Sequence, residues 1–269
     1  MSNVITLITD FGTADGYVGT MHGVILKICP EAHIVDISHE IAPQDLRQAA
    51  YVLYTAYPYF PDGTVHVVVV DPGVGSQRRA IALRPERAVF VAPDNGVLSY
   101  VAAREDVLEI VDVTNPRYWL GEISATFHGR DIFSPVGAHL ACGVPLSSVG
   151  RPLSEIITFD LMKPGTGADG VIRGHVLHVD HFGNIITDIR EEMLEGMCDA
   201  RVEIAGRSIE ASIEGISTTY AVADVGDLVA LIGSEGHLEI AVRDGNAGAM
   251  LGAVAGDEVV VRPPFGKVS

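Results

Sequence analysis

The chain has 269 residues, with 35 Asp and Glu against 18 Lys and Arg, and a formal net charge of −17 at pH 7. This balance excludes a general nucleic-acid binder, because such proteins present a basic face to the phosphates. No stretch has the length and apolarity of a transmembrane helix, and the N-terminus enters an apolar run without a signal-peptide pattern, so we expect a cytoplasmic protein with a small-molecule partner and no membrane.

The first part of the chain alternates strand and helix patterns. Strands are predicted over residues 5–9, 33–37, 65–70, 88–91 and 107–111, and amphipathic helices over 17–28 and 45–57. This alternation predicts an α/β domain over residues 1–163, built from βαβ units around a mainly parallel sheet.

The organisation changes after residue 163. The composition P-G-T-G-A-D-G over residues 164–170 is typical of a linker. Short apolar runs then recur over 171–179, 184–189, 200–204, 228–232, 238–242 and 258–262, separated by Gly and Asp. They predict a smaller C-terminal all-β, barrel-like domain over residues 171–269.

One strand ends in a conspicuous polar motif. The run T-V-H-V-V-V-V is apolar on both faces, which favours a buried parallel strand, and it is followed by D-P-G-V-G-S-Q-R. Ligands of open α/β sheets bind beyond the carboxyl ends of the strands, so Asp71 and Arg78 are candidate site residues. An Asp that only stabilises a turn would give the same local sequence.

Two other segments repeat this arrangement. The strand predicted over residues 5–9 ends at Asp10, and T-F-H-G-R-D-I-F places His128 and Arg130 before a helix expected to open at S-P. We expect these side chains to meet at one edge of the sheet, with the two arginines neutralising the carboxylates.

Metal and disulfide chemistry are not indicated. The histidines show no H-E-x-x-H or comparable spacing, so we predict no metal site. Cys29, Cys142 and Cys198 are widely separated and form no C-x-x-C pair. We expect them to be small core residues in a reducing compartment rather than ligands or bridges.

Six motifs in order resemble one family. T-D-F-G-T-A-D-G-Y-V, D-P-G-V-G-S-Q-R-R, A-P-D-N-G-V-L, F-H-G-R-D-I-F-S-P, D-H-F-G-N and L-E-I-A-V together are similar to the S-adenosyl-L-methionine (SAM) hydroxide adenosyltransferases, relatives of the SAM-dependent fluorinases and chlorinases. The resemblance spans almost the whole chain. It implies an N-terminal α/β domain, a C-terminal β-barrel and a homotrimer with sites at subunit interfaces.

The resemblance implies hydrolysis of SAM to adenosine and L-methionine, possible for either sulfur epimer, with no cofactor. Its catalytic set falls on Asp71, Arg78 and His128. Methionine leaves a sulfonium as a neutral thioether, so only the attacking water needs help. A cation beside that water favours hydroxide, and an imidazole can hold or accept the proton.

The resemblance also implies substrate-binding residues. Asp10 would bind the ribose hydroxyls and Asp15 the methionine ammonium, while Phe127 and Tyr220 would pack on ribose and base. The remaining residues of this set come from the C-terminal domain: Asp180, Asn184, Ser234 and Glu235.

Two alternatives stay open at this point. A SAM-dependent halogenase is disfavoured because Gly129 stands where the halogenases have Ser, and Tyr17 where fluorinases have Ser. The turn V-R-D-G around Arg243 also departs from the Asn-containing turn expected near the adenine. A non-catalytic SAM or adenosine sensor would not need the Asp71, Arg78 and His128 set.

Overall fold

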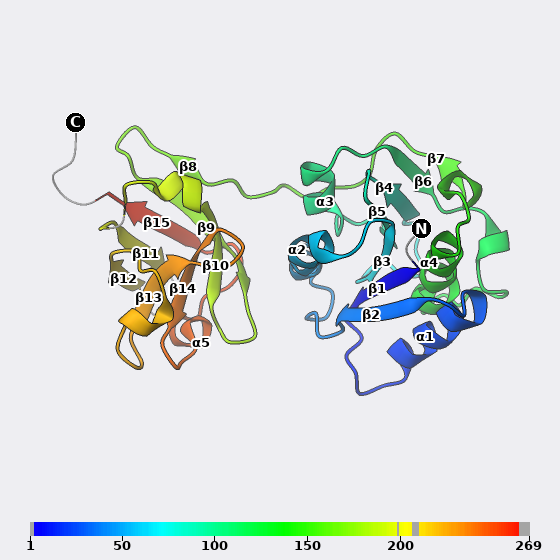
Figure 1. Ribbon diagram of the computed structural model, residues 1–269, viewed down its shortest axis with the longest axis horizontal. Coiled ribbons are helices and arrows are strands. Elements are labelled where there is room, and N and C mark those ends of the chain that lie inside the picture. The colour runs from blue at the N-terminus through cyan, green and yellow to red at the C-terminus, as the bar shows by residue number, and fades with distance from the viewer. Residues whose placement is uncertain (1–2, 198, 206–209, 264–269) are drawn as a thin grey trace. The chain divides into compact units, whose positions relative to one another are not determined.

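The computed structural model describes residues 3–197, 199–205 and 210–263. The chain divides into two compact units, Met1–Asp160 and Leu161–Ser269 (Figure 1). Among the described residues, no helix is long and apolar enough to cross a membrane.

The first unit contains a seven-stranded mixed sheet in the order β2-β1-β3-β5-β4-β6-β7. Its strands are β1 (Val4–Thr9), β2 (His33–Ser38), β3 (Thr64–Val69), β4 (Ala80–Arg84), β5 (Ala88–Pro93), β6 (Glu109–Asp112) and β7 (Arg151–Pro152). The first four in the sheet order are parallel, and β4, β6 and β7 extend it with antiparallel pairings. The predicted α/β class is confirmed.

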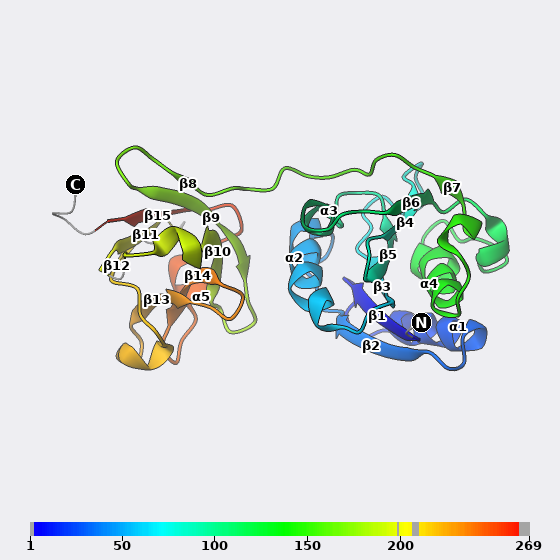
Figure 2. The ribbon, with the colours of Figure 1, turned by 45° about the horizontal axis from the view of Figure 1, so that its top comes forward.

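Helices cover both faces of this sheet. Figures 1 and 2 show α1 (Tyr17–Ile28) and α4 (Ser134–Ala141) on one face and α2 (Leu46–Ala56) and α3 (Ser99–Arg104) on the other. Strand β3 is fully buried because alternate valines enter the two cores: Val67 packs with α1 and α4, and Val68 with α2 and α3. This two-sided burial explains its uninterrupted apolar sequence.

The predicted helices have clear boundaries. α1 has the predicted bounds, and α2 begins after Asp45, whose side chain accepts the Gln48 N–H at 2.9 Å. Pro135 lies in the first turn of α4, as expected, because proline there removes no helical hydrogen bond. Gly129–Phe133 forms a π-helical turn that runs directly into α4, and such turns are frequent at functional sites.

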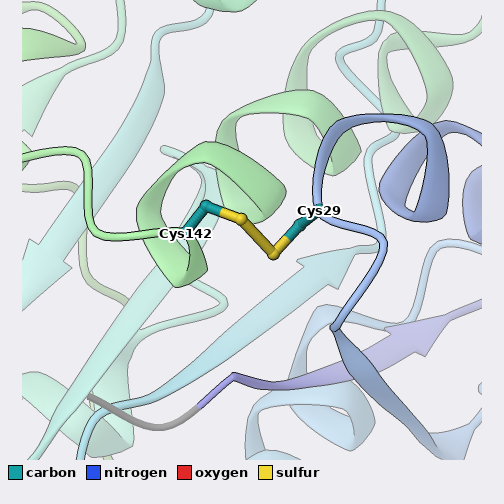
Figure 3. The surroundings of a disulfide bond; sticks show 2 residues. All are labelled: Cys29 and Cys142. Carbon is teal, nitrogen blue, oxygen red and sulfur yellow. A yellow bond between two sulfur atoms is a disulfide. The ribbon is translucent and has the colours of Figure 1, made fainter.

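The prediction that Cys29 and Cys142 are unbridged core residues is wrong. They form a disulfide with Cα atoms 6.0 Å apart (Figure 3). Cys29 follows α1 and Cys142 follows α4, and these helices pack together on one face of the sheet. The 113-residue separation hid this proximity in the sequence. Cys198 lies outside the described residues.

The second unit is an antiparallel, barrel-like sheet in the order β12-β11-β15-β9-β10-β14-β13, with β8 paired to β9. Its strands are β8 (Gly165–Thr166), β9 (Ile172–Val179), β10 (Ile185–Arg190), β11 (Arg201–Ala205), β12 (Glu210–Glu214), β13 (Leu228–Ile232), β14 (His237–Val242) and β15 (Glu258–Arg262). The edge strands β12 and β13 contact each other, so the sheet is nearly closed. The predicted barrel-like architecture is confirmed.

The interior of this barrel is filled by alternate residues of its strands. Val259 and Val261 of β15 and Ile172 and Val176 of β9 are fully buried in one core. A short helix, α5 (Ala247–Leu251), closes onto the same core through Leu251. The sequence analysis predicted neither α5 nor β12, because both segments are short and carry few large apolar residues.

Candidate active site

A cavity of about 380 Å³ opens at the carboxyl ends of β1 and β3 in the first unit. This volume lies within the range of small-molecule sites. Its lining comes from four loops that follow strands or precede helices: Asp10, Phe11, Tyr17, Gln44, Val69, Asp71, Pro72, Val74, Thr126, Phe127, His128 and Gly129. The sequence-predicted residues Asp10, Asp71, Phe127 and His128 therefore share one wall.

Asp71 and Arg78 form a buried ion pair beside this cavity. Asp71 follows β3, and its side chain is 5% exposed while that of Arg78 is 10% exposed. Arg78 Nε donates to Asp71 Oδ1 at 2.8 Å, and Arg78 Nη2 donates to Oδ2. The guanidinium also lies over the Phe133 ring, 5.1 Å from its centre. These contacts leave Arg78 little freedom to move.

His128 is the third member of this group. Arg78 Nη2 donates to His128 Nδ1 at 2.7 Å. A guanidinium has no acceptor, so Nδ1 must carry a lone pair and the ring proton must reside on Nε2. Asp71 and His128 line the cavity, whereas Arg78 does not belong to the described lining. Arg78 therefore bonds both Asp71 and His128 from outside the cavity lining.

The surroundings of His128 favour the neutral ring. Burial and the Arg78 charge lower the pKa of His128 below its ordinary value of 6.5, against smaller opposing effects of Asp71 and Asp131. A hydrogen bond to the Ser124 backbone raises the pKa of His128 and so partly opposes this shift. A neutral imidazole is the form that can accept the Arg78 hydrogen bond.

The loop between Asp71 and Arg78 depends on a glycine. Gly75 has a φ of 76°, and a Cβ at this position would overlap the carbonyl oxygen of Ala125. The loop that carries Arg78 therefore lies directly against the loop that precedes His128. Only glycine combines this backbone conformation with this approach.

Arg130 does not neutralise the cavity carboxylates, contrary to our expectation. Its Nε donates to Asp131 Oδ1 at 2.6 Å, and its guanidinium lies over the Phe127 ring. Asp131 is fully buried and also accepts the Ser124 N–H at 2.7 Å. This pair anchors the loop before His128 from outside the cavity.

Asp10 is held by backbone. Its Oδ2 accepts the N–H of Gln44 at 2.8 Å, and Gln44 has a φ of 67°. One carboxylate oxygen of Asp10 is thus oriented, and the side chain still lines the cavity. Asp15 is exposed and lies outside the described lining.

Three aromatic rings form the apolar side of the cavity. Phe127 meets Tyr17 edge to face at 5.2 Å and Phe11 at 5.8 Å. Tyr17 is half exposed. The sequence analysis named Phe127 but gave Phe11, Gln44 and Thr126 no role, because only the folded loops bring them together.

The second unit has its own open groove, of about 890 Å³. Its described lining is Phe182, Asn184, Thr219, Tyr220, Ala221, Val242, Arg243, Asp244 and Gly245. Phe182 is 72% exposed, an unusual state for a large aromatic side chain. Asn184 and Tyr220, two of the predicted binding residues, line this groove.

Three other predicted residues do not belong to the described lining of this groove. Asp180 accepts the Phe182 and Asn184 N–H groups at 2.9 and 2.8 Å, so it shapes its own turn. Ser234 and Glu235 occupy the turn between β13 and β14, where Ser234 is exposed.

Glu239 is a buried carboxylate that the sequence analysis missed. It is 7% exposed and accepts a hydrogen bond from the Tyr220 hydroxyl. Burial raises the pKa of Glu239, an effect that Asp180 reinforces and the Tyr220 bond opposes. The strand pattern of β14 does not distinguish Glu239 from a solvent-facing polar residue, so the sequence did not indicate its burial.

Arg243 braces the groove. Its Nη1 donates to the carbonyl oxygens of Ala223 at 2.7 Å and Ala221 at 3.2 Å. The V-R-D-G turn, in which the sequence lacks the expected Asn, therefore supports the segment that carries Tyr220.

The chain matches two family models over most of its length. These are the SAM hydroxide adenosyltransferase N-terminal domain, over residues 5–150, and the corresponding C-terminal domain, over residues 174–260. The chain is 40% identical to an (R)-S-adenosyl-L-methionine hydrolase from Salinispora tropica, covering 96% of this chain and 97% of the relative. It is 32% identical to a fluorinase from an Actinoplanes species, covering 88% and 90%.

Two solved structures are similar to this chain in fold. An uncharacterized conserved protein from Thermotoga maritima superposes with a TM-score of 0.89 at 40% identity, covering 96% of this chain and 99% of that one. A conserved hypothetical protein from Thermus thermophilus superposes with a TM-score of 0.78 at 34% identity, covering 97% and 100%. The chain therefore belongs to the SAM hydroxide adenosyltransferase family, as its motifs predicted.

Proposed function

We propose that this enzyme hydrolyses (R)-S-adenosyl-L-methionine to adenosine and L-methionine. The observation that carries the proposal is the arrangement of Asp71 and His128 in one cavity wall, joined by Arg78 behind it. Relatives named (R)-S-adenosyl-L-methionine hydrolase, at 40% identity over nearly the whole chain, support the same activity.

The reaction is a substitution at the ribose C5′. A water oxygen forms a bond to C5′ while the C5′–S bond breaks, and its electron pair returns to sulfur to give the neutral thioether of methionine. The water loses one proton, so the products are adenosine, methionine and H⁺. No cofactor is needed, because the sulfonium is already an activated leaving group.

We propose that Asp71 and His128 position the water. Asp71 has acceptor capacity beyond its bonds to Arg78, so its carboxylate can accept a water hydrogen and then the proton. His128 lines the same cavity and can help to hold the water there. Orienting the water in line with the C5′–S bond lowers the barrier through positioning.

Arg78 is a positioning residue in this scheme rather than a direct partner of the water. It fixes the Asp71 carboxylate through two nitrogens and fixes the His128 tautomer through one. Together with burial, which has the larger effect, its charge also lowers the pKa of His128.

We propose that Asp10 binds the ribose hydroxyls through the carboxylate that Gln44 orients, and that Phe127 packs on the sugar. Asp15 would meet the methionine ammonium. From a neighbouring subunit, Asn184 and Tyr220 of the open groove would contact substrate, and Asp180, Ser234 and Glu235 of that subunit would act on its amino-acid end.

Halide use is disfavoured because Gly129 replaces the Ser that, by the family resemblance, helps to hold the halide in halogenases. A Cβ there would lie 3.3 Å from atoms of Phe11, Met21 and Phe127, so the residue sits in a tight aromatic setting. We therefore assign the chain to the hydrolases rather than to the halogenases named among its more distant relatives.

The experiment is chromatography of products from resolved (R)- and (S)-SAM, with and without chloride. Adenosine and methionine from the (R) epimer, unchanged by chloride, support the proposal. A 5′-chlorinated nucleoside would establish a halogenase. Tight binding of either epimer without turnover would establish a sensor.

The proposal for quaternary structure is a homotrimer, which the family resemblance implies. Sedimentation should give three times the chain mass of 28.6 kDa. If residues of a neighbouring subunit complete the site, mixing inactive D71N with inactive N184A chains should restore part of the activity. We also propose the cytoplasmic location expected from the sequence. Disulfides are rare in that compartment, so the thiol state of Cys29 and Cys142 in cells tests this proposal.

A further inference from the structure

Two histidines and one carboxylate converge at the edge of the sheet, beside the cavity described above. His22 lies on α1, Asp36 on β2, and His39 directly after β2. His22 Nε2 is 2.9 Å and His39 Nε2 is 3.0 Å from the same oxygen, Asp36 Oδ1. One ligand atom from each of the three side chains lies within 4.8 Å of the others.

His39 is the most informative member of this cluster. It is 5% exposed, and its Nε2 lies 3.0 Å from Asp36 Oδ1, although this contact does not have the geometry of a well-formed hydrogen bond. Its Nδ1 lies 2.8 Å from Thr9 Oγ1. The Thr9 hydroxyl can accept from Nδ1 or donate to it, so both ring tautomers fit this contact. With the proton on Nδ1, the buried Nε2 and Asp36 Oδ1 would both offer lone pairs to a cation between them.

We propose that His22, Asp36 and His39 bind a divalent transition-metal ion of the Zn²⁺ class. Imidazole and carboxylate are donors that suit Zn²⁺, whereas Mg²⁺ and Ca²⁺ prefer oxygen donors alone. Donors about 2.0–2.1 Å from a tetrahedral ion lie roughly 3.3 Å apart. His22 Nε2 and His39 Nε2 lie 2.9 and 3.0 Å from Asp36 Oδ1, so these two distances need to lengthen only slightly to fit an ion.

The second coordination layer and the access route fit such an ion. A hydrogen bond from the non-ligating nitrogen to a neighbouring acceptor is the usual way to orient a ligating histidine, and Thr9 supplies it here. The side chains of His22 and Asp36 are 30% and 39% exposed. The ion would therefore reach the site from solvent and keep a fourth position for water.

The expected role of the ion is structural. It would tie α1 to the end of β2, where the His39 carbonyl also accepts the Gly12 N–H at 2.8 Å. Thr9 precedes the cavity residue Asp10, so the clamp borders the active site without contributing a residue to its described lining. This inference is independent of the proposed hydrolysis.

The test is Zn²⁺ binding to the full-length protein after dialysis against EDTA, measured by calorimetry, with Co²⁺ absorption as a second readout. We expect one ion per chain and a higher Tm with Zn²⁺. H22A should weaken binding by at least about 100-fold, since even outer-layer partners contribute about 10- to 100-fold. His22 is half-buried on the surface of α1, so this variant should fold.

H33A is the matched control, because His33 is an exposed histidine at the start of the same strand. It should bind Zn²⁺ as the wild type does and show the same Tm shift. D36N should resemble H22A. No stoichiometric binding by the wild type, or equal binding by the wild type and H22A, would overturn the proposal and leave a hydrogen-bonded cluster without an ion.

Discussion

Arg78 donates through Nη2 to Nδ1 of His128 at 2.7 Å, and this single contact fixes which form of the imidazole the site contains. Because a guanidinium offers only donors, His128 must be neutral with its proton on Nε2. The same nitrogen of Arg78 also bonds Asp71, so one side chain orients both Asp71 and His128 in the cavity lining.

The first prediction concerns the Asp71 carboxylate. D71N keeps the shape of the side chain but removes the charge and one acceptor, so kcat should fall by about 10²–10⁴. KM should change little, because the water rather than the substrate is affected. D10A is the contrast: it should mainly raise KM, through the lost ribose contact. Equal losses of affinity in both variants would contradict the assigned roles.

The second prediction separates positioning from stability. R78M leaves the buried Asp71 without its partner and should lower the free energy of unfolding by about 3–5 kcal/mol. D71N/R78M removes both charges and should recover most of that stability but none of the activity. Chemical denaturation and turnover of the four proteins of this cycle give both readouts. Activity in the double variant would show that the pair only supports the fold.

The third prediction is a pH profile. Burial and Arg78 lower the pKa of His128 below 6.5, and protonation would place an imidazolium against the guanidinium. kcat/KM should therefore be level above pH 6.5 and fall as the pH drops through the lowered pKa. The contribution of His128 to stability has the same sign: complete above the unfolded-state pKa near 6.5 and lost on acidification.

H128N tests the origin of that acid limb. Asparagine retains an acceptor for Arg78 but does not titrate, so its residual activity should lack the limb. A limb centred above pH 6.5 in the wild type, or one that persists in H128N, would assign it to another group.

The fourth prediction concerns Gly75. G75A would force a residue with a Cβ into a φ of 76° and against the Ala125 carbonyl. We expect a lower kcat, because the loop carrying Arg78 must shift. G121A is the control, since a Cβ there meets nothing within 4 Å. Similar kcat values for the two variants would show that loop packing at Gly75 does not set the position of Arg78.

The fifth prediction concerns the disulfide. Reduction, or C29S, should lower the free energy of unfolding by about 2–4 kcal/mol, because the bond closes a long loop in the unfolded chain. Denaturation with and without reductant measures this. An unchanged midpoint, with thiols titrated as free before reduction, would mean that the bond does not form in solution.

The sequence predicted the elements whose signal is local. β3 was predicted because its run of apolar residues matches a strand buried on both faces, and α2 was predicted from its amphipathic pattern. Asp71 directly follows β3 in the sequence. Because ligands bind beyond the carboxyl ends of such strands, Asp71 became a candidate site residue.

The rest depended on contacts between distant segments. Cys29 and Cys142 meet only after α1 and α4 pack together. The sequence offers several carboxylates as partners for Arg130, and in the fold Arg130 pairs with the adjacent Asp131. His22 and His39 show no metal-binding spacing in the sequence, because the end of α1 and the whole of β2 lie between them. Such pairings need the folded chain.

If water attacks the ribose C5′, its oxygen becomes the 5′-hydroxyl oxygen of adenosine, and isotope labelling detects it there. The protein is incubated with (R)-SAM in ¹⁸O-labelled water, and the adenosine is analysed by mass spectrometry. We expect ¹⁸O in the 5′-hydroxyl of adenosine and none in methionine. Adenosine without the label, or a product cleaved at another bond of the sulfonium, would contradict it.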